Sequence, residues 1–364
     1  MINKLVVENL KHRPVRTLLS VIAISIQVTM VLTLVGLSRG MLDEQARRAR
    51  GVGADVLIRP PGGNIIISGG QMQARIIPVI VEKQLHVSVA SGVLIYATDM
   101  FNYVTGVDLA TFNKMSGGFR YVQGGPFQHP DDVLVDTLYA AQRKLHVGDS
   151  TSILNRSWRV AGIYEPGMLA RMVVPLDVLQ DLTANTGKIS MIYVKLDDPA
   201  KTNEVIAALT ERLKEYKVYS MEEFMTLFSP GNFPWLLQFT YVVISLGVLV
   251  GFLVVFLSMY TAVLERTREI GILKALGASP SFILNVLLRE TTLLAIAGSA
   301  LGFALSYATR YVIAQLVPAT FIQAIVYDWW PITAGLALAG ALLGALYPGL
   351  KAARQDAIEA LAYE

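Results

Sequence analysis

The sequence of 364 residues contains no cysteine and little charge. Without cysteine it has no disulfide framework and no thiolate chemistry, although this absence does not decide the cellular compartment. Charged residues make up 16% of the chain, whereas soluble domains carry about a quarter. The apolar fraction is 53% and the mean hydropathy is +0.49. The composition therefore favours a membrane protein. The net charge is only +3, and the basic residues lie beside apolar segments, so we expect no nucleic-acid partner.

The sequence also lacks the common motifs of nucleotide and metal chemistry. It contains no G-x-x-x-x-G-K-[ST] phosphate loop and no H-E-x-x-H zinc motif. The cores of the apolar segments hold no Asp, Glu, Lys or Arg, which argues against a proton relay or an intramembrane enzyme. We therefore predict no catalytic residues, no metal site and no cofactor bound by this chain.

Long apolar segments are what the sequence does have. A bilayer core of about 30 Å requires roughly 20 apolar residues in a helix. The sequence predicts four transmembrane helices, at 17–39, 237–264, 283–311 and 329–350. The first could be a signal peptide, but its apolar run is long and no small-x-small cleavage site closes it, so we interpret it as an uncleaved anchor.

Lysine and arginine in the short flanks predict the orientation. Basic residues gather before the first segment, between the second and third, and after the fourth, whereas the loop 312–328 has none. By the positive-inside rule, both termini and the segment 265–282 face the cytoplasm, and 40–236 lies outside. We expect a cytoplasmic amphipathic helix at 1–16, a short periplasmic loop at 312–328 and a cytoplasmic tail at 351–364, in a bacterial inner membrane.

The large segment 40–236 has the pattern of an α+β domain between helices 1 and 2. Stretches rich in Val, Ile and Tyr predict strands near 55–58, 75–81, 87–95, 133–135, 151–163 and 189–196. Helices are predicted at 137–145 and 202–216, the latter capped by Thr202 or Asn203. The Gly- and Pro-rich stretch 60–70 reads as a linker. We interpret Asp131 and Asp132 as solvated loop residues rather than metal ligands.

A short charged stretch lies between the second and third apolar segments. Its residues read E-R-T-R-E-I-G-I-L-K-A-L-G-A-S from Glu265 to Ser279. Apolar residues recur at helical spacing, Gly277 is placed to end the helix, and Ser279-Pro280 to start the next one. Such a helix could lie on lipid headgroups or seat in a groove on a soluble partner, and the acidic residues and glycines favour the partner. The predicted docking residues are Glu265, Arg266, Arg268, Glu269, Ile270, Leu273, Lys274, Leu276 and Gly277.

This stretch resembles the signature of FtsX-like ABC transporter permeases of the MacB type. A second match lies in the tail, where 347–354 and 358–361 resemble the family's P-x-x-x-A-A-R-x-x-P-I-E-A-L ending, with Ala357 in place of the usual proline. The segments 133–149 and 158–163 resemble the strand, helix, G-D turn and V-x-G-I strand of the family's periplasmic core domain. The resemblance covers almost the whole chain.

The resemblance implies a permease subunit whose work is driven by a separate ABC ATPase dimer, which would bind ATP and magnesium. It implies mechanotransmission: the ATPase moves the cytoplasmic helix, and the membrane helices pass the motion outward to export a hydrophobic or amphiphilic substrate. The expected partners are the ATPase, a second permease subunit that forms a homodimer, membrane lipids, and a periplasmic adaptor in some systems. Two alternatives stay open: an FtsX-like signalling subunit that activates a periplasmic cell-wall hydrolase, and a lipoprotein-releasing permease.

Overall fold

A computed structural model describes Val6 and residues 8–9, 11–61, 72–99, 102–316 and 321–355. Its contacts divide the chain into two units. The helical unit comprises the described residues of 1–39, 234–313 and 323–364. The α/β unit comprises 40–233 and the described residues of 314–322. Each is described by itself below.

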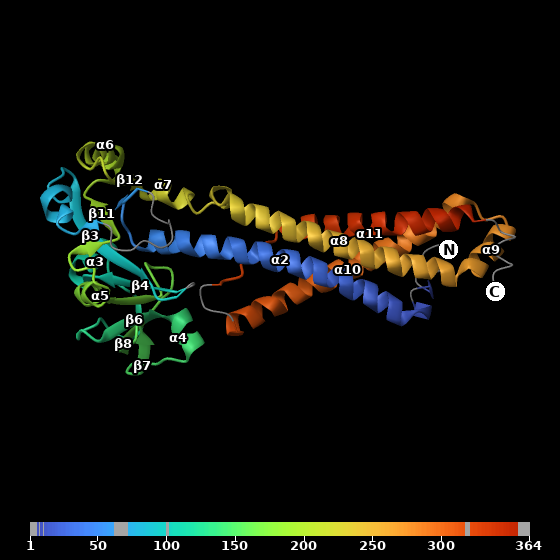
Figure 1. The fold of residues 1–364 in the computed structure, drawn as a ribbon, viewed down its shortest axis with the longest axis horizontal. Coiled ribbons are helices and arrows are strands. Elements are labelled where there is room, and N and C mark those ends of the chain that lie inside the picture. The colour runs from blue at the N-terminus through green and yellow to red at the C-terminus, as the bar shows by residue number, and fades with distance from the viewer. Residues whose placement is uncertain are drawn as a thin grey trace. The chain divides into compact units, whose positions relative to one another are not determined.

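In its described residues the helical unit contains four long helices and a short one that lies between two of them (Figure 1). The long helices are α2 (Pro14–Gly51), α8 (Pro234–Glu265), α10 (Pro280–Leu316) and α11 (Trp329–Arg354), and the short one is α9 (Thr267–Ala275). All four long helices are long and apolar enough to cross a bilayer. These four candidate spans among the described residues fit the four apolar segments of the prediction. Helix α2 differs from its predicted bounds, because it continues past residue 39 to Gly51 and ends inside the α/β unit.

Glycines allow the long helices to pack closely. A Cβ atom built on Gly298 of α10 would lie 2.6 Å from Cβ of Ile24 on α2, and one built on Gly302 would lie 2.7 Å from Cβ of Val28. On α11, a Cβ atom at Gly344 would lie 2.7 Å from the carbonyl oxygen of Phe252 on α8. Small residues spaced four apart are the usual means of close helix packing in membranes, where burial of apolar surface provides little driving force.

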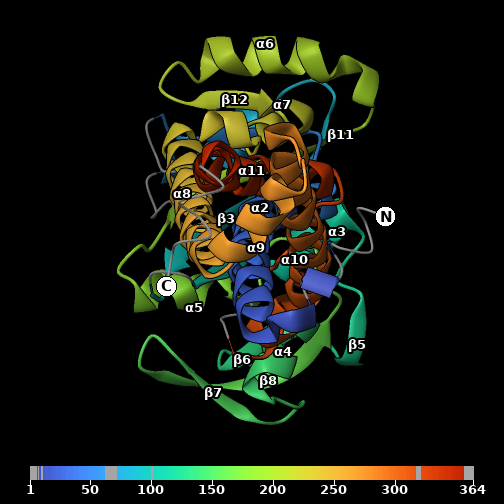
Figure 2. The same cartoon turned by 90° about the vertical axis from the view of Figure 1, so that its right-hand side faces the viewer.

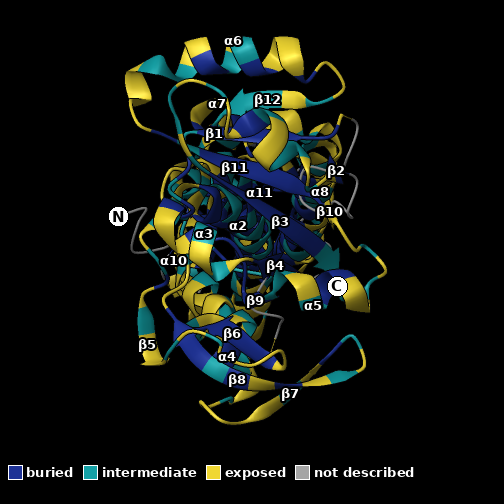
Figure 3. Cartoon of the chain, turned by 90° about the vertical axis from the view of Figure 1, so that its left-hand side faces the viewer, coloured by how far each residue is buried: buried dark blue, intermediate teal, exposed yellow. Residues whose placement is uncertain are grey.

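A mixed sheet forms the centre of the α/β unit, with buried strands in the middle (Figure 3). The strand order is β12-β1-β11-β3-β4-β9-β6-β8-β5, and β7 pairs with β8. All neighbours are antiparallel except β4–β9 and β6–β8. The strands of this sheet are β1 (Val56–Arg59), β3 (Val87–Ala97), β4 (Tyr103–Val107), β5 (Tyr121–Gly124), β6 (Asp132–Asp136), β7 (Ser150–Ile153), β8 (Arg156–Tyr164), β9 (Met172–Pro175), β11 (Met191–Leu196) and β12 (Lys217–Ser220).

Short helices and a separate two-stranded sheet complete this unit. The small sheet pairs β2 with β10. These remaining elements are β2 (Met72–Gln73), β10 (Lys188–Ile189), α3 (Leu109–Ser116), α4 (Thr137–Arg143), α5 (Leu176–Leu182), α6 (Thr202–Arg212), α7 (Met221–Thr226), the π-helical turn η1 (Ile77–Val81) and the 3₁₀ turns η2 (Pro199–Lys201) and η3 (Pro230–Asn232). The expectation of a mixed α/β domain is confirmed at this level.

Several local predictions are wrong in detail. The stretch 75–81 contains the π-helical turn η1 instead of a strand, and Pro78 in its first turn leaves no N–H there for a sheet ladder. The extended stretch 151–163 is a hairpin of β7 and β8, whose turn residues Leu154 and Asn155 both have positive φ, as two-residue hairpin loops require. Helix α6 has no side-chain cap, because its N-cap is Lys201.

Parts of two sequence features lie outside the described residues. Residues 62–71 of the predicted linker are not described, nor are residues 356–364, which include the 358–361 part of the tail motif. Of the predicted helix at 1–16, Val6 and residues 8–9 and 11–16 are described.

Candidate functional site

The C-terminus of α9 and the start of α10 lie where the sequence predicts them. Gly277 has φ +93, which places it in the left-handed region that terminates many helices. The Ala278 N–H donates to Leu273 O at 2.9 Å, and the Gly277 N–H donates to Lys274 O at 3.0 Å. This is the Schellman pattern of a helix C-terminus. Oγ of Ser279 then accepts from the N–H of Phe282 at the start of α10.

One face of α9 is open. Among the predicted docking residues, Glu265 and Gly277 are exposed at the two ends of α9, and Arg268, Glu269 and Leu276 are exposed along it, with Leu276 81% exposed. Ile272, which is not among the predicted docking residues, is 47% exposed beside them. Figure 2 shows α9 at the near end of the helices. The open face thus combines two apolar side chains with charges of both signs. We call Arg268, Glu269, Ile272 and Leu276 the α9 face.

The opposite face of α9 packs into its own chain. Ile270 is buried, and together with Leu273 it lines a hollow of about 110 Å³ shared with Phe282 and Val286 of α10. These two residues therefore support the helix from beneath. The prediction placed them on the docking surface because helical periodicity identifies an apolar stripe but not what covers it.

Lys274 also turns inward, to the end of α11. Its Nζ donates to Ala353 O at 2.8 Å and to Gln355 O. The last carbonyls of a helix have no partner within the helix and carry partial negative charge, so a lysine there stabilises the helix end. Lys274 joins the C-terminal part of α9 to α11.

The other end of α9 joins a cluster of charges. Arg266 Nη1 lies 3.2 Å from Glu290 Oε2 of α10, and Arg16 Nη2 of α2 lies 3.1 Å from Glu290 Oε1. Glu265 pairs with Arg13 and lies 3.8 Å from Arg16. We call Arg13, Arg16, Glu265, Arg266 and Glu290 the base cluster.

Sequence reasoning missed Glu290. It falls near the start of the predicted segment 283–311 and was given no role, but in the structure its side chain is 1% exposed. One sequence signal for Glu290 was available. Glu290 and Arg16 each lie at the cytoplasmic end of an apolar segment in the predicted topology, where opposite charges can pair. Which pairs form depends on how the helices pack, and a single sequence does not give that.

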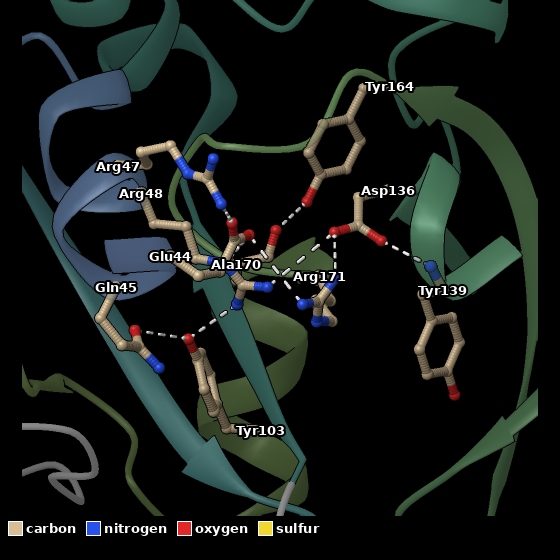
Figure 4. A network of polar contacts seen from close by, with 10 residues as sticks. All are labelled: Glu44, Gln45, Arg47, Arg48, Tyr103, Asp136, Tyr139, Tyr164, Ala170 and Arg171. Atoms are coloured by element: carbon tan, nitrogen blue, oxygen red, sulfur yellow. Dashed lines mark hydrogen bonds and ion pairs between the residues drawn. The ribbon is translucent and has the colours of Figure 1, made fainter. Parts of the chain in front are cut away.

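A second set of buried charges lies in the α/β unit, around the last turns of α2 (Figure 4). Glu44 accepts from Nε of Arg48 at 3.1 Å, and Arg171 Nη1 donates to Asp136 Oδ2 at 3.0 Å. The two pairs meet, because Glu44 Oε1 lies 3.9 Å from Arg171 Nη2 and Arg48 Nη2 lies 4.0 Å from Asp136. Tyr103 accepts from Arg48 at 2.9 Å. Two carboxylates and two guanidinium groups thus share one buried volume.

Burial opposes the charge of all four groups, but the ion pairs outweigh it at Glu44, whose pKa is lowered, and at Arg48, whose pKa is raised. At Asp136 and Arg171 the dominant cause is burial. It raises the pKa of the Asp136 carboxyl, although Arg171 and the Tyr139 N–H stabilise its charge. It lowers the pKa of the Arg171 guanidinium, and neighbouring Arg48 lowers that pKa further. Burial also raises the pKa of the Tyr164 hydroxyl, which donates to Ala170 O. Asp136 has a second task, since its Oδ1 accepts from the N–H of Tyr139 at 2.7 Å and caps α4. The sequence analysis did not anticipate this network.

Asp132 corrects another prediction. It is 1% exposed, and its Oδ2 accepts from the N–H groups of Gln128 at 2.9 Å and His129 at 3.0 Å. Arg159 donates to its Oδ1. Burial by itself would raise the pKa of Asp132, but these hydrogen bonds outweigh it and lower the pKa below its usual value. Asp131 is exposed and pairs with Arg156, so only Asp131 behaves as the predicted solvated residue.

The structure thus defines a class: a multi-pass membrane protein with a mixed α/β domain and a short charged helix between two of its apolar helices. Comparisons with known families agree. Residues 17–212 match the MacB-like periplasmic core domain, and residues 241–357 match the FtsX-like permease C-terminal region. The chain belongs to the MacB-type family of FtsX-like permeases.

Several relatives of the chain are named as macrolide export proteins. It is 24% identical over 388 aligned residues to the macrolide export ATP-binding/permease protein MacB of Escherichia coli, covering 98% of this chain and 59% of that protein. It is 36% identical over 187 residues to MacB of Chromobacterium violaceum, covering 48% of this chain and 27% of that protein. The crystal structure of the periplasmic region of MacB from Actinobacillus actinomycetemcomitans aligns with a TM-score of 0.36 and 16% identity, over 50% of this chain and 95% of that one. The chain spans a little more than half of the E. coli relative's length.

Proposed function

We propose that the chain is the permease subunit of an ABC exporter and that the α9 face is where a separate ATPase subunit docks. The observation that carries this proposal is the construction of α9. Its outer face presents Ile272 and Leu276 beside Arg268 and Glu269, whereas its two ends are tied to other helices by Arg266 and Lys274. A face with apolar anchors and flanking charges suits a protein groove, and a helix tied at both ends passes force on rather than absorbing it.

Energy must come from a partner in this proposal. The 364 residues contain no phosphate-loop motif, and the E. coli relative is named for both an ATP-binding and a permease function. The partner ATPase, acting as a dimer, would hold ATP and magnesium. A second copy of the permease would complete the membrane part, and a periplasmic adaptor could extend it outward. The relatives' names favour export over the signalling and lipoprotein-releasing alternatives.

The proposed topology follows from charge. Both termini and α9 face the cytoplasm, and the α/β unit between α2 and α8 lies in the periplasm of a bacterial inner membrane. The substrate would be hydrophobic or amphiphilic. It would be expelled by mechanotransmission, with the motion of α9 carried through the membrane helices to the α/β unit.

The docking role is tested by changing the α9 face alone. The tagged chain is co-expressed with each ABC ATPase subunit of its source organism, purified in detergent, and assayed for captured ATPase and for ATP hydrolysis. The Arg268→Glu/Leu276→Glu variant is expected to lose at least about 2 kcal/mol of binding free energy, as for a hot-spot pair, and with it the captured ATPase.

The matched control reverses the same charge and adds the same carboxylate elsewhere. Arg212→Glu/Leu182→Glu alters exposed residues of α6 and α5 and should capture the ATPase like the unmodified chain. Equal capture by the α9 variant and the control would refute the docking site. Hydrolysis of ATP by the purified chain without any ATPase would refute the division of labour.

A further inference from the structure

We propose that Glu290 is the positioning residue that fastens the base of α2 to the start of α9, so that a displacement of α9 also displaces α2. This rests on the proposed function, because it names how the docked helix would drive another membrane helix. Glu290 itself lies on neither of the two helices that it joins. It belongs to α10 and accepts from one arginine on each side.

The geometry assigns one carboxylate oxygen to each helix. Oε1 of Glu290 lies 3.1 Å from Arg16 Nη2, in the first turn of α2. Oε2 lies 3.2 Å from Nη1 of Arg266, the N-cap residue of α9. Arg266 also donates through Nη2 to the backbone carbonyl of Asn9, 3.2 Å away. The carboxylate of Glu290 therefore connects α2 to the start of α9, and the guanidinium group of Arg266 connects the start of α9 to the chain before α2.

Burial makes the ion pairs of Glu290 costly to break. The side chain of Glu290 is 1% exposed and that of Arg266 is 8% exposed, so water does not replace a lost partner readily. Removing one member of a buried ion pair leaves the other charge without compensation, which is far more costly than losing a surface pair. Separating α2 from α9 would require that loss. The two helices are therefore held in one relative position at this end of the helical unit.

The link has one unused donor. Arg16 Nη1 is buried and has no hydrogen-bond partner among the described residues, and the carboxylate of Glu265 lies 3.8 Å away. Glu265 ends α8 and is held by Arg13. Arg13, Arg16, Glu265, Arg266 and Glu290 thus connect α2, α8, α9 and α10 without a fully saturated set of hydrogen bonds.

The test measures the link directly, without the ATPase. Because the chain has no cysteine, single cysteines at Val15 and Ala275 give two unique spin-label positions, both exposed, on α2 and α9. The distance distribution between the labels is recorded by pulsed electron resonance in lipid nanodiscs. The unmodified chain should give one narrow peak. Glu290→Gln should broaden or split it, whereas Glu211→Gln, an exposed change on α6, should not.

The functional readout separates positioning from simple instability. With the ATPase captured in the docking experiment, Glu290→Gln should bind it and hydrolyse ATP within about twofold of the unmodified complex, with unchanged KM for ATP, since Glu290 is not part of the α9 face. The shift of the α2 label on addition of ATP and vanadate should fall at least about tenfold relative to the unmodified chain. Loss of binding, hydrolysis and label shift together would indicate a merely structural residue and would overturn the proposal.

A second variant keeps the proposal testable if Glu290→Gln does not fold. Arg16→Met/Glu290→Leu/Arg266→Met replaces the buried charges by apolar groups, a change that proteins often tolerate. Folded protein with a broadened label distribution supports the ionic link, and a narrow distribution with a full nucleotide-driven shift overturns it. If no ATPase is captured by any variant, the proposed function fails, while the nanodisc measurement still decides the role of Glu290.

Discussion

At the scale of single residues, neighbours in sequence can have opposite environments. The sequence places Asp131 and Asp132 together after a proline, where both read as loop carboxylates. In the structure Asp132 is buried under a turn and accepts two backbone N–H groups, while Asp131 is exposed. Asp131 belongs to the turn before β6, whereas Asp132 is the first residue of that buried strand. Which of the two carboxylates is buried therefore depends on where the turn ends and the strand begins, and the sequence does not give that boundary.

This contrast predicts a pH-dependent difference in stability. Asp132→Ala should lower the free energy of unfolding of the α/β unit by about 1–3 kcal/mol, because two backbone N–H groups and Arg159 lose a buried charged acceptor. The pKa of Asp132 is lowered by folding, so its contribution is complete above the unfolded value of about 3.9 and is lost as the pH falls through the lower folded value. The contribution of Asp132 to stability is measured by hydrogen exchange of a peptide spanning 128–136, compared at neutral and acidic pH.

Asp131→Ala is the matched control, since it removes the same group from an exposed neighbour. Its effect should stay within about 0.5 kcal/mol at every pH, as for most surface substitutions. Equal effects of the two substitutions would show that the buried hydrogen bonds of Asp132 do not stabilise the turn.

At the scale of elements, the sequence predicted where the apolar helices lie better than how they pack. Gly277 and Ser279-Pro280 could be read correctly, because helix termini have local chemical signals. The pairing of α2 with α10 through Gly298 and Gly302 could not, because glycines four apart occur in α8, α10 and α11 alike. Only the packed structure shows which glycine pair faces which helix.

The close approach of α2 and α10 predicts the effect of larger side chains. Gly298→Val/Gly302→Val would place each new Cβ atom within 2.7 Å of a Cβ atom on α2. Overpacking of this kind costs about 1–3 kcal/mol for each site, so the thermal midpoint of the helical unit in detergent should fall. Gly335→Val on α11 has the same chemistry but meets no atom within 4 Å, and it should leave the midpoint close to that of the parent. A fall caused by the control alone would contradict the described packing.

At the scale of the whole molecule, composition was sufficient to predict a membrane protein, and short motifs were sufficient to predict its family. The matches to residues 17–212 and 241–357 cover the regions that carried the resemblance, except the tail residues 358–361. The charged clusters escaped prediction for a physical reason. Glu290 and Arg266 lie 24 positions apart, and Asp136 and Arg171 lie 35 apart, so neither pair leaves a periodic or local signal. Each forms only when separate elements have packed.

The proposed orientation makes a prediction about chemical access. With no native cysteine, Lys114→Cys on α3 and Ala275→Cys on α9 each provide one exposed thiol. In intact spheroplasts a membrane-impermeant maleimide should label Lys114→Cys at once, and Ala275→Cys only after permeabilisation, because the positive-inside rule places α9 in the cytoplasm. The unmodified chain reports background labelling. The reverse pattern would invert the topology and remove α9 from reach of any cytoplasmic ATPase.

The location of Glu44 and Arg48 moves the N-terminal boundary of the α/β unit into helix α2. Both residues belong to α2, yet their partners Arg171 and Asp136 lie next to β9 and at the end of β6. A soluble fragment cut just before β1 would lack Glu44 and Arg48, and the buried pair of Asp136 and Arg171 would lose its neighbouring carboxylate and guanidinium group. The last turns of α2 are therefore an integral part of the α/β unit. A fragment made for crystallisation should begin no later than residue 40.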